Sequence, residues 1–167
     1  MKAISDSTAL ISLSKIGFLD FLKELFEEII IPKEVYNETI ILGRISGKSD
    51  ILSIERLIEQ KFITIKEPKS IIEIESLDKG EKECISLCKE LDIDTILIDE
   101  TEGFNISEML NLLPIRTTSI LTIFLDNKII NLDKYKISLK KIIENGYFLD
   151  ALTYERLLEI GKNIAKK

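Results

Sequence analysis

The most informative feature of the sequence is an absence, because it contains no histidine. Catalysis by a serine or cysteine that a histidine activates is therefore excluded, and so is a metal site built on imidazole ligands. Cysteine is scarce too, with only Cys84 and Cys88. They lie four residues apart on one predicted helix, where a disulfide has poor geometry, and two thiolates cannot complete a structural zinc site. We interpret both as core residues of a reduced protein.

Carboxylates remain as the groups that can carry chemistry. If the protein is an enzyme, they would act with a hard, oxygen-preferring cation such as Mg²⁺ or Mn²⁺. The chain has 29 acidic and 23 basic residues, which gives a formal net charge of −6. We therefore expect no broad basic surface for nucleic acid, although a local basic patch, or metal ions in an acidic pocket, would still allow binding.

Long apolar runs are also missing. None approaches the ~20 residues needed to span a bilayer, and the start of the chain, a short apolar strand followed by Asp6, does not resemble a signal peptide. We therefore expect a cytoplasmic protein with no membrane association. The length of 167 residues fits a single domain with a substantial core.

Short apolar runs alternate with amphipathic segments along the chain. The predicted strands are residues 1–5, 28–32, 61–66, 95–99 and 114–118. The predicted helices are residues 7–17, 18–26, 32–42, 51–60, 80–92 and 119–128, with a loop at 43–50 and a loop or short helix between 100 and about 112. Such alternation is typical of βαβ units, so we expect an α/β fold, a three-layer α/β/α sandwich around a mostly parallel central sheet.

The C-terminal part of the sequence predicts helices without strands, and we expect it to form a helical extension packed on this domain. From about residue 132 to residue 167 the pattern predicts two helices, with a hinge at the NGYF segment, residues 145–148. Asp150 is the expected N-cap of the last helix.

Four acids stand out by their position. In parallel sheets of this kind ligands bind beyond the carboxyl ends of the strands. Asp6 follows the first predicted strand, and Asp99 ends the fourth with Glu100 beside it, while Glu38 and Glu81 lie on the apolar faces of their helices. Carboxylates that converge repel one another unless a cation neutralises them. The pattern therefore points to a divalent-metal site able to activate water in phosphodiester hydrolysis.

Each acid also has a purely structural interpretation, which the pattern leaves open. Glu81 can remain exposed as a first-turn acid that favours the helix dipole. Asp6 and Asp99 can each cap the helix that follows. Glu34 competes with Glu38 for the inward position, because the rotation of their helix is uncertain by one residue.

Several segments, taken together and in this order, resemble the PIN-domain family. They are DSTALISLSKIGFLDFLKELF, IIIPKEVYNE, LDKGEKECISL and ILIDE, followed by the tail NGYFLDALTYERLLEIGK. The D-x-G-E helix start and the LID-[DE] strand end are similar to the prokaryotic, toxin-type branch. The resemblance covers nearly the whole chain and implies a single PIN-like domain over residues 1–167 with strand order 3-2-1-4-5.

The resemblance also implies a function. It implies a ribonuclease dependent on Mg²⁺ or Mn²⁺, commonly the toxin of a toxin–antitoxin pair, with an RNA substrate, a cognate antitoxin and frequent homodimers. Matched by position, Asp6, Glu38, Glu81 and Asp99 are the catalytic acids and metal ligands. Glu100 stands where that branch often has a second aspartate, and is a further candidate metal ligand.

Five other residues are candidates for contacts with the substrate. Ser7, Thr8 and Thr118 carry hydroxyls near the expected site and are candidates for orienting phosphate. Arg44 and Lys48, in the predicted loop before the fourth helix, are candidates for contacts with the RNA backbone.

The chain departs from the family pattern beyond Asp99. TEGFNISEML is acidic and polar where basic or small residues are usual, and TTSIL replaces a glycine-containing turn, although Ser119 can still cap a helix. A catalytically silent PIN-like interaction protein therefore remains an alternative. A Mg²⁺-dependent receiver or phosphotransfer module is disfavoured, because the first strand offers only Asp6 and no lysine follows the last strand.

Overall fold

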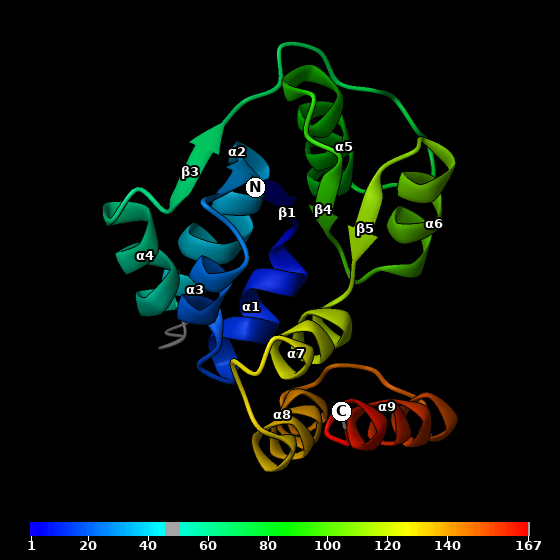
Figure 1. Ribbon diagram of the computed structural model, residues 1–167. Helices are drawn as coiled ribbons and strands as arrows, with labels where there is room; N and C mark the ends of the chain where they lie inside the picture. Colours follow the sequence, from blue (N-terminus) through cyan, green and yellow to red (C-terminus); the bar gives the residue numbers. More distant parts are fainter. Residues whose placement is uncertain (46–50, 167) are drawn as a thin grey trace.

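Five parallel strands form the centre of the protein. The computed structural model describes residues 1–45 and 51–166 (Figure 1). The strands are β1 Lys2–Ser5, β2 Glu28–Pro32, β3 Ile63–Lys66, β4 Thr95–Leu97 and β5 Leu113–Ile115. They lie in the order β3-β2-β1-β4-β5, and each neighbouring pair is parallel. The predicted α/β fold class and strand order are confirmed.

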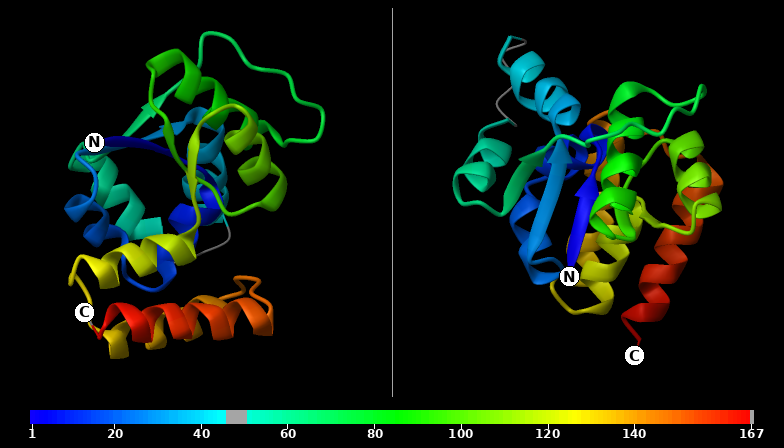
Figure 2. Two further views of the ribbon diagram at one scale, coloured as in Figure 1. Left: turned by 45° about the vertical axis from the view of Figure 1, so that its right-hand side comes forward. Right: turned by 90° about the horizontal axis from the view of Figure 1, so that it is seen from above.

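Helices flank this sheet. In the first half they are α1 Ser7–Lys15, the 3-10 helix η1 Leu19–Glu24, α2 Lys33–Tyr36, the π-helix η2 Asn37–Ile41, α3 Leu42–Ile45 and α4 Ile51–Glu59. In the second half they are α5 Lys79–Leu91, α6 Thr101–Met109, α7 Thr117–Asp126, α8 Leu132–Glu144 and α9 Ala151–Ile164. Right-handed crossovers place α1 and α4 on one face of the sheet and α5 on the other (Figure 2).

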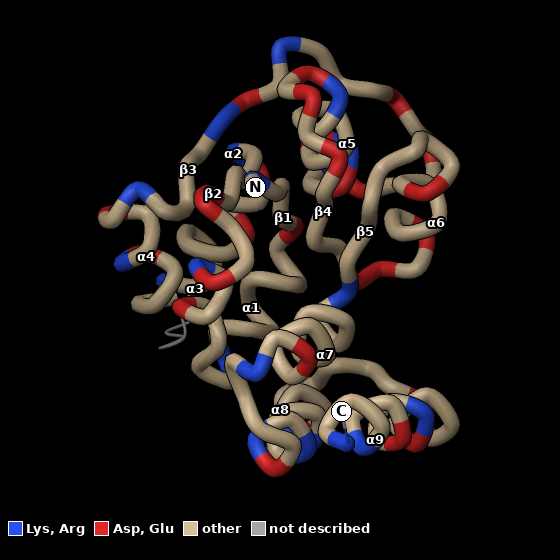
Figure 3. Tube along the Cα trace, in the orientation of Figure 1, with Lys and Arg blue, Asp and Glu red and all other residues tan. Residues whose placement is uncertain are grey.

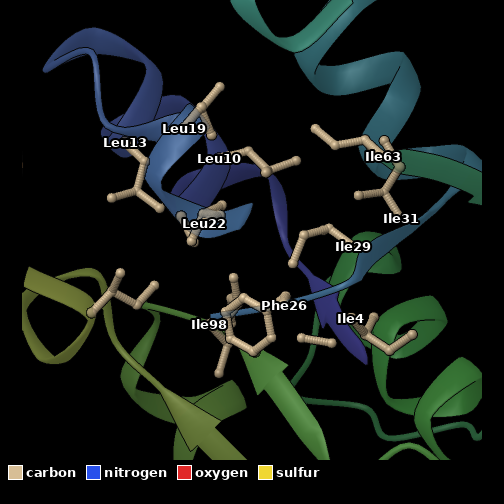
Figure 4. Close-up of a cluster of buried hydrophobic side chains, with 14 of the residues drawn as sticks. Ile4, Leu10, Leu13, Leu19, Leu22, Phe26, Ile29, Ile31, Ile63 and Ile98 are labelled. Atoms are coloured by element: carbon tan, nitrogen blue, oxygen red, sulfur yellow. The ribbon is translucent and has the colours of Figure 1, made fainter. Parts of the chain in front are cut away.

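The core lies between the sheet and these helices. Because both faces of the sheet are covered, its inner strands are apolar at consecutive positions instead of alternating. Figure 4 shows Ile4 and Ile29 from the strands with Leu10 and Leu22 from the helices, all of them buried. Cys84 is also fully buried, and burial raises the pKa of its thiol. Both cysteines are free and packed in the core, as predicted.

The helical stretch after β2 is longer than predicted. α2, η2 and α3 follow one another without a break to Ile45, so Gly43 and Arg44, predicted to lie in a loop, are helical. The rest of that predicted loop, residues 46–50, lies outside the described residues. Lys48, a candidate for RNA contacts, is among them.

The last strand is shorter than predicted. β5 ends at Ile115 and α7 begins at Thr117, so Thr118 lies in the first helical turn instead of in the strand. Ser119 is not the cap, because the N-cap position belongs to Arg116, whose side chain makes no capping hydrogen bond. The helix N-terminus is instead capped from another part of the chain.

The C-terminal helices pack against α7 (Figures 1 and 2). Tyr135 of α8 is fully buried, and its hydroxyl donates to the Leu157 carbonyl of α9 at 3.1 Å. Asp150 caps α9 by accepting a hydrogen bond from the Thr153 N–H at 2.9 Å, as predicted. Among the described helices, none combines the length and the apolar character needed to cross a membrane.

Candidate active site

The two strand-end aspartates lie side by side at the carboxyl edge of the sheet. β1 and β4 are paired, so Asp6 and Asp99, which follow them, become neighbours. The backbone N–H of Asp99 is 3.4 Å from Asp6 Oδ2, and the Ala9 N–H donates to Asp6 Oδ1 at 2.8 Å. Asp6 therefore caps α1 with one oxygen and faces Asp99 with the other. Both of its predicted roles are compatible in one side chain.

Asp6 is an unfavourable place for a negative charge. Its side chain is only 4% exposed. Burial raises the pKa of its carboxyl well above the usual 3.8, and the negative charge of Asp99 raises it further, whereas the N–H donors of Ala9 and Asp99 oppose the increase. An ionised Asp6 is therefore costly unless a proton or a cation accompanies it.

Glu81 combines the two roles that the sequence left open. It forms a reciprocal capping box with Asp78 at the start of α5. The Glu81 N–H donates to Asp78 Oδ1 at 2.8 Å, and the Asp78 N–H donates to Glu81 Oε2 at 3.0 Å. Yet Glu81 is only 7% exposed, and its Oε1 is buried without a hydrogen-bond partner among the residues that the structure describes. One oxygen therefore caps the helix, and the other makes no such contact there.

Gly103 of α6 makes room for this carboxylate. A Cβ atom at position 103 would lie 2.5 Å from Glu81 Oε1 and 2.5 Å from the Ile98 side chain. Only glycine lets α6 approach Glu81 this closely. In the sequence, the segment TEGFN stands out only as acidic and polar. A glycine in the first turn of a helix, where alanine would be preferred, was the available signal for a close approach.

A small cavity brings together most of the predicted site residues, and we call it the carboxylate cavity. Its volume is about 20 Å³, which is room for roughly one water-sized sphere. It is lined by Asp6, Ser7, Thr8, Val35, Glu38, Asp78, Gly80, Glu81 and Glu100. Six of these nine were predicted from the sequence as metal ligands or substrate contacts.

Glu38 reaches this cavity from the π-helix η2. Burial raises the pKa of its carboxyl, the nearby charge of Asp78 adds to the increase, and Ser7, which can donate a hydrogen bond to it, works against it. Glu34 instead forms an ion pair with Lys79 at 2.6 Å and does not line the cavity. Glu38 is therefore the inward acid, as the apolar positions of the sequence indicated, although η2 is a π-helix with more residues per turn than an α-helix.

Asp99 does not line the carboxylate cavity, and both of its carboxylate oxygens accept hydrogen bonds. The Thr117 N–H donates to Asp99 Oδ1 at 2.8 Å and the Thr117 hydroxyl donates to Oδ2 at 2.7 Å. Asp99 thus caps α7, whereas α6, the next helix, has Glu100 at its N-cap position without a capping hydrogen bond from that side chain. The alternative in which Asp99 caps the helix that follows it is not found, because the pairing of β4 with β5 places the start of α7 beside it.

Tyr147 completes the environment of Asp99 and was not predicted. Its hydroxyl donates to Asp99 Oδ1 at 2.7 Å. Burial raises the pKa of the Tyr147 phenol, and the charge of Asp99 raises it further. The sequence showed the NGYF segment only as a hinge, and nothing in it indicated contact with a residue nearly fifty positions earlier.

A basic side chain lies on the same side of the site. Figure 3 shows a basic segment between β5 and α7 beside the acidic segment that precedes α6. Arg116 hydrogen-bonds to the carbonyl oxygen of Asp99, and its guanidinium carbon lies 4.4 Å from the centre of the Phe104 ring. Arg116 was also missed, because an arginine at the end of a short strand carries no pattern of its own.

Three of the residues predicted to contact substrate lie at or near the site, whereas Arg44 does not. Ser7 and Thr8 line the carboxylate cavity, and Thr118 is buried in α7 near Tyr147. Arg44 is not brought to the carboxylates. It pairs with Glu55 of α4, with Nε 2.6 Å from Oε1.

The donor chemistry of the cavity fits a hard divalent cation. The unpartnered oxygen of Glu81 and the buried carboxyl of Asp6 are the ligand type that Mg²⁺ and Mn²⁺ prefer. Over residues 1–45 and 51–166, however, no three acidic or cysteine side chains come close enough together to hold an ion. Asp99 lies beside Asp6 but does not line the carboxylate cavity, so the four predicted acids do not all line one space.

Removing the buried charges should stabilise the protein when divalent cations are absent. A raised carboxyl pKa means that the folded state binds protons more tightly than the unfolded chain, so stability falls as pH rises from the usual values of 3.8 and 4.5 through the raised ones. Asn at position 6 and Gln at position 81 keep the capping oxygens. Asp6→Asn and Glu81→Gln should therefore raise the melting temperature by a few degrees at neutral pH and by less near about pH 4.

Calorimetry in EDTA across this pH range tests the expectation. Glu155→Gln, an exposed position on α9, is the matched control and should show no such pH-dependent gain. Lower melting temperatures for both cavity variants at neutral pH would contradict it.

Loss of the Tyr147 hydroxyl should destabilise the fold. Tyr147→Phe removes one hydrogen bond to a buried carboxylate, which costs about 1–3 kcal/mol of unfolding free energy. Urea denaturation measures it, with Tyr154→Phe as the control, since the Tyr154 hydroxyl bonds to none of the described residues. Equal effects of the two substitutions would show that the contact with Asp99 contributes nothing.

Comparison with known proteins identifies the family. The chain matches DUF3368, described as a PIN domain, over residues 2–162. Among solved structures, a PilT N-terminus domain protein from the hyperthermophilic archaeon Sulfolobus solfataricus P2 has a TM-score of 0.52 at 15% identity, over 70% of this chain and 87% of that one. None of the curated proteins compared with the chain matches it significantly. The likeness to the archaeal structure supports the fold alone, whereas the family match spans nearly all of the sequence, and the chain belongs to the PIN-domain family.

Proposed function

We propose that the protein is a divalent-metal-dependent endoribonuclease. The observation that carries the proposal is the buried Oε1 atom of Glu81, which has no hydrogen-bond partner among the described residues and belongs to a side chain that lines a cavity with Asp6 and Glu38. A buried carboxylate oxygen without a donor is rare in folded proteins, and a bound cation explains it. PIN domains are generally nucleases and typically use divalent metal ions.

The chain's own residues have distinct parts in this proposal. Glu81, Asp6 and Glu38 would hold Mg²⁺ or Mn²⁺, with Glu100 at the rim of the cavity. A cation held there supplies Lewis-acid polarisation of a phosphoryl oxygen and lowers the pKa of water. The hydroxyls of Ser7 and Thr8 line the same cavity and can donate hydrogen bonds to a phosphate oxygen.

Asp99 has a more indirect part. Its two carboxylate oxygens accept hydrogen bonds from Thr117 and Tyr147, and its charge faces Asp6. The negative charge of Asp99, beside Asp6, would attract a cation held in the cavity. We therefore propose Asp99 as a residue that orients and tunes the cavity, with direct ligation dependent on a change in its hydrogen bonds.

The biological setting follows from the family only by analogy. We propose that the protein acts in the cytoplasm as the toxin of a toxin–antitoxin pair, with RNA as substrate, a cognate antitoxin as inhibitor and a homodimer as the assembled form. The motifs that carry this analogy are the D-x-G-E helix start at residues 78–81 and the LIDE strand end at residues 97–100.

A catalytically silent interaction protein is the second candidate. It is favoured by the absence of Asp99 from the lining of the carboxylate cavity and by the lack, among the described residues, of three side chains close enough to hold one ion. Such a protein would keep the fold and the capping roles of Asp6 and Glu81 but would not cleave RNA.

Cleavage of a pooled tRNA, rRNA and mRNA mixture with Mn²⁺ distinguishes the two. Wild type should cleave, and Asp6→Asn and Glu81→Gln should each lower the rate by at least about 100-fold, because the loss of a charged ligand removes several kcal/mol of stabilisation. Both variants retain their capping groups, so circular dichroism should show them folded.

Glu155→Gln is the control for a change of one negative charge and should cleave as wild type does. Full activity in both cavity variants would contradict the proposal that the carboxylate cavity is the nuclease site. No cleavage by wild type with either Mn²⁺ or Mg²⁺ would favour the silent protein.

A further inference from the structure

A second cleft adjoins the carboxylate cavity, and we call it the outer cleft. Its volume is about 400 Å³, and Thr8 and Glu100 line both spaces. Its walls come from α1, from the junction of β5 with α7, and from the connection between α8 and α9. A ligand in the outer cleft would therefore lie directly beside the carboxylates. The volume is in the range of small-molecule sites.

The connection between α8 and α9 is anchored on both sides of a tight turn. Gly146 has a φ of +93°, a conformation that favours glycine. Before it, the Asn145 carbonyl accepts a hydrogen bond from Lys15 Nζ at 3.1 Å, and after it Tyr147 donates to Asp99. The turn thus fixes the position of the next residue, Phe148.

Phe148 is an exposed aromatic ring in this fixed place. It is 89% exposed and lines the outer cleft, whereas its neighbour Tyr147 points inward to Asp99. The ring gains almost nothing from burial in the fold, so its contribution to stability is small. An accessible aromatic face is, however, what a nucleobase needs for stacking, at any base identity.

The outer cleft has basic side chains beside its aromatic ring, which suits the phosphate and the base of a nucleotide. Lys15 and Arg116 line it with Phe148, and Asp99 and Glu100 line the part nearest to the carboxylate cavity. The cations can contact phosphate while the aromatic ring contacts the base. This pairing of a stacking surface with local positive charge occurs on a protein of net charge −6, where broad electrostatic attraction to nucleic acid is weak.

We propose that the outer cleft binds one nucleotide of a single-stranded RNA, with the base stacked on Phe148 and the phosphate contacted by Lys15 and Arg116. The inference rests on the proposed nuclease function for its substrate class and extends it to a positioning site. Single strands are favoured because a base in a duplex has its faces covered by its neighbours and cannot reach an aromatic side chain. A strand held in the outer cleft would pass a neighbouring phosphate to the carboxylate cavity.

Binding in the absence of catalysis tests this proposal. A fluorescein-labelled single-stranded RNA of mixed sequence, about ten nucleotides long, is titrated with protein in EDTA at low salt and followed by anisotropy. Phe148→Ala should weaken binding by roughly five- to 150-fold, the range that base stacking on aromatic side chains spans. Phe148→Trp keeps a stacking surface and should bind at least as well as wild type.

The matched control is Met109→Ala. Met109 is 81% exposed, similar to Phe148, but it lies at the end of α6 and does not line the outer cleft. It should leave the dissociation constant unchanged. Both residues are so exposed that neither substitution should affect the melting temperature.

The outcomes separate this inference from the proposed function. Phe148-dependent binding by a protein that does not cleave RNA with Mn²⁺ would support the outer cleft and refute the nuclease. If Phe148→Ala cleaves RNA and its dissociation constant and KM equal those of wild type, the nuclease is supported and the role of the outer cleft is refuted. The inference is also overturned if wild type shows no saturable binding, or if a duplex of the same sequence binds as tightly as the single strand.

Discussion

The burial of negative charge at the carboxyl edge of the sheet is the constraint on which the rest of the site depends. Asp6 and Glu81 are each nearly inaccessible to solvent, and each gives one oxygen to a helix N-terminus. Asp6 Oδ2 faces the backbone N–H of Asp99, Glu81 Oε1 has no hydrogen-bond partner among the described residues, and both side chains line a cavity with room for about one water molecule. Capping fixes the orientation of the two side chains. Their remaining oxygens are buried, and among the described residues no basic side chain neutralises them.

The fold supports this arrangement from three directions. The pairing of β1 with β4 brings Asp6 beside Asp99, and the glycine at position 103 lets α6 close over Glu81. The connection between α8 and α9 contributes Tyr147, whose hydroxyl donates a hydrogen bond to Asp99. The tail is thus a part of the site and not only a cover for α7. This explains why a family resemblance that includes the tail is informative about the chemistry of residues near the N-terminus.

Much of this arrangement was predictable from the sequence, for identifiable reasons. Strand-end acids and apolar helix faces obey simple periodicities, so Asp6 and Glu81 were found and the parallel sheet was confirmed. The choice between Glu38 and Glu34 was uncertain because the sequence does not fix the rotation of their helix to within one residue, and the structure places Glu38 at the cavity. The partners of Asp99 were not predictable, since Thr117 and Tyr147 reach it through strand pairing and helix packing, which join distant parts of the chain.

The central claim, that the carboxylate cavity takes a divalent cation through the free oxygen of Glu81, is tested most directly by calorimetric titration with Mn²⁺ at neutral pH. Wild type should bind Mn²⁺ saturably, and Glu81→Gln, which keeps the capping oxygen but loses the charge, should bind at least about tenfold more weakly, equivalent to about 1.4 kcal/mol. Identical isotherms for the two proteins, or no binding by wild type, would contradict it.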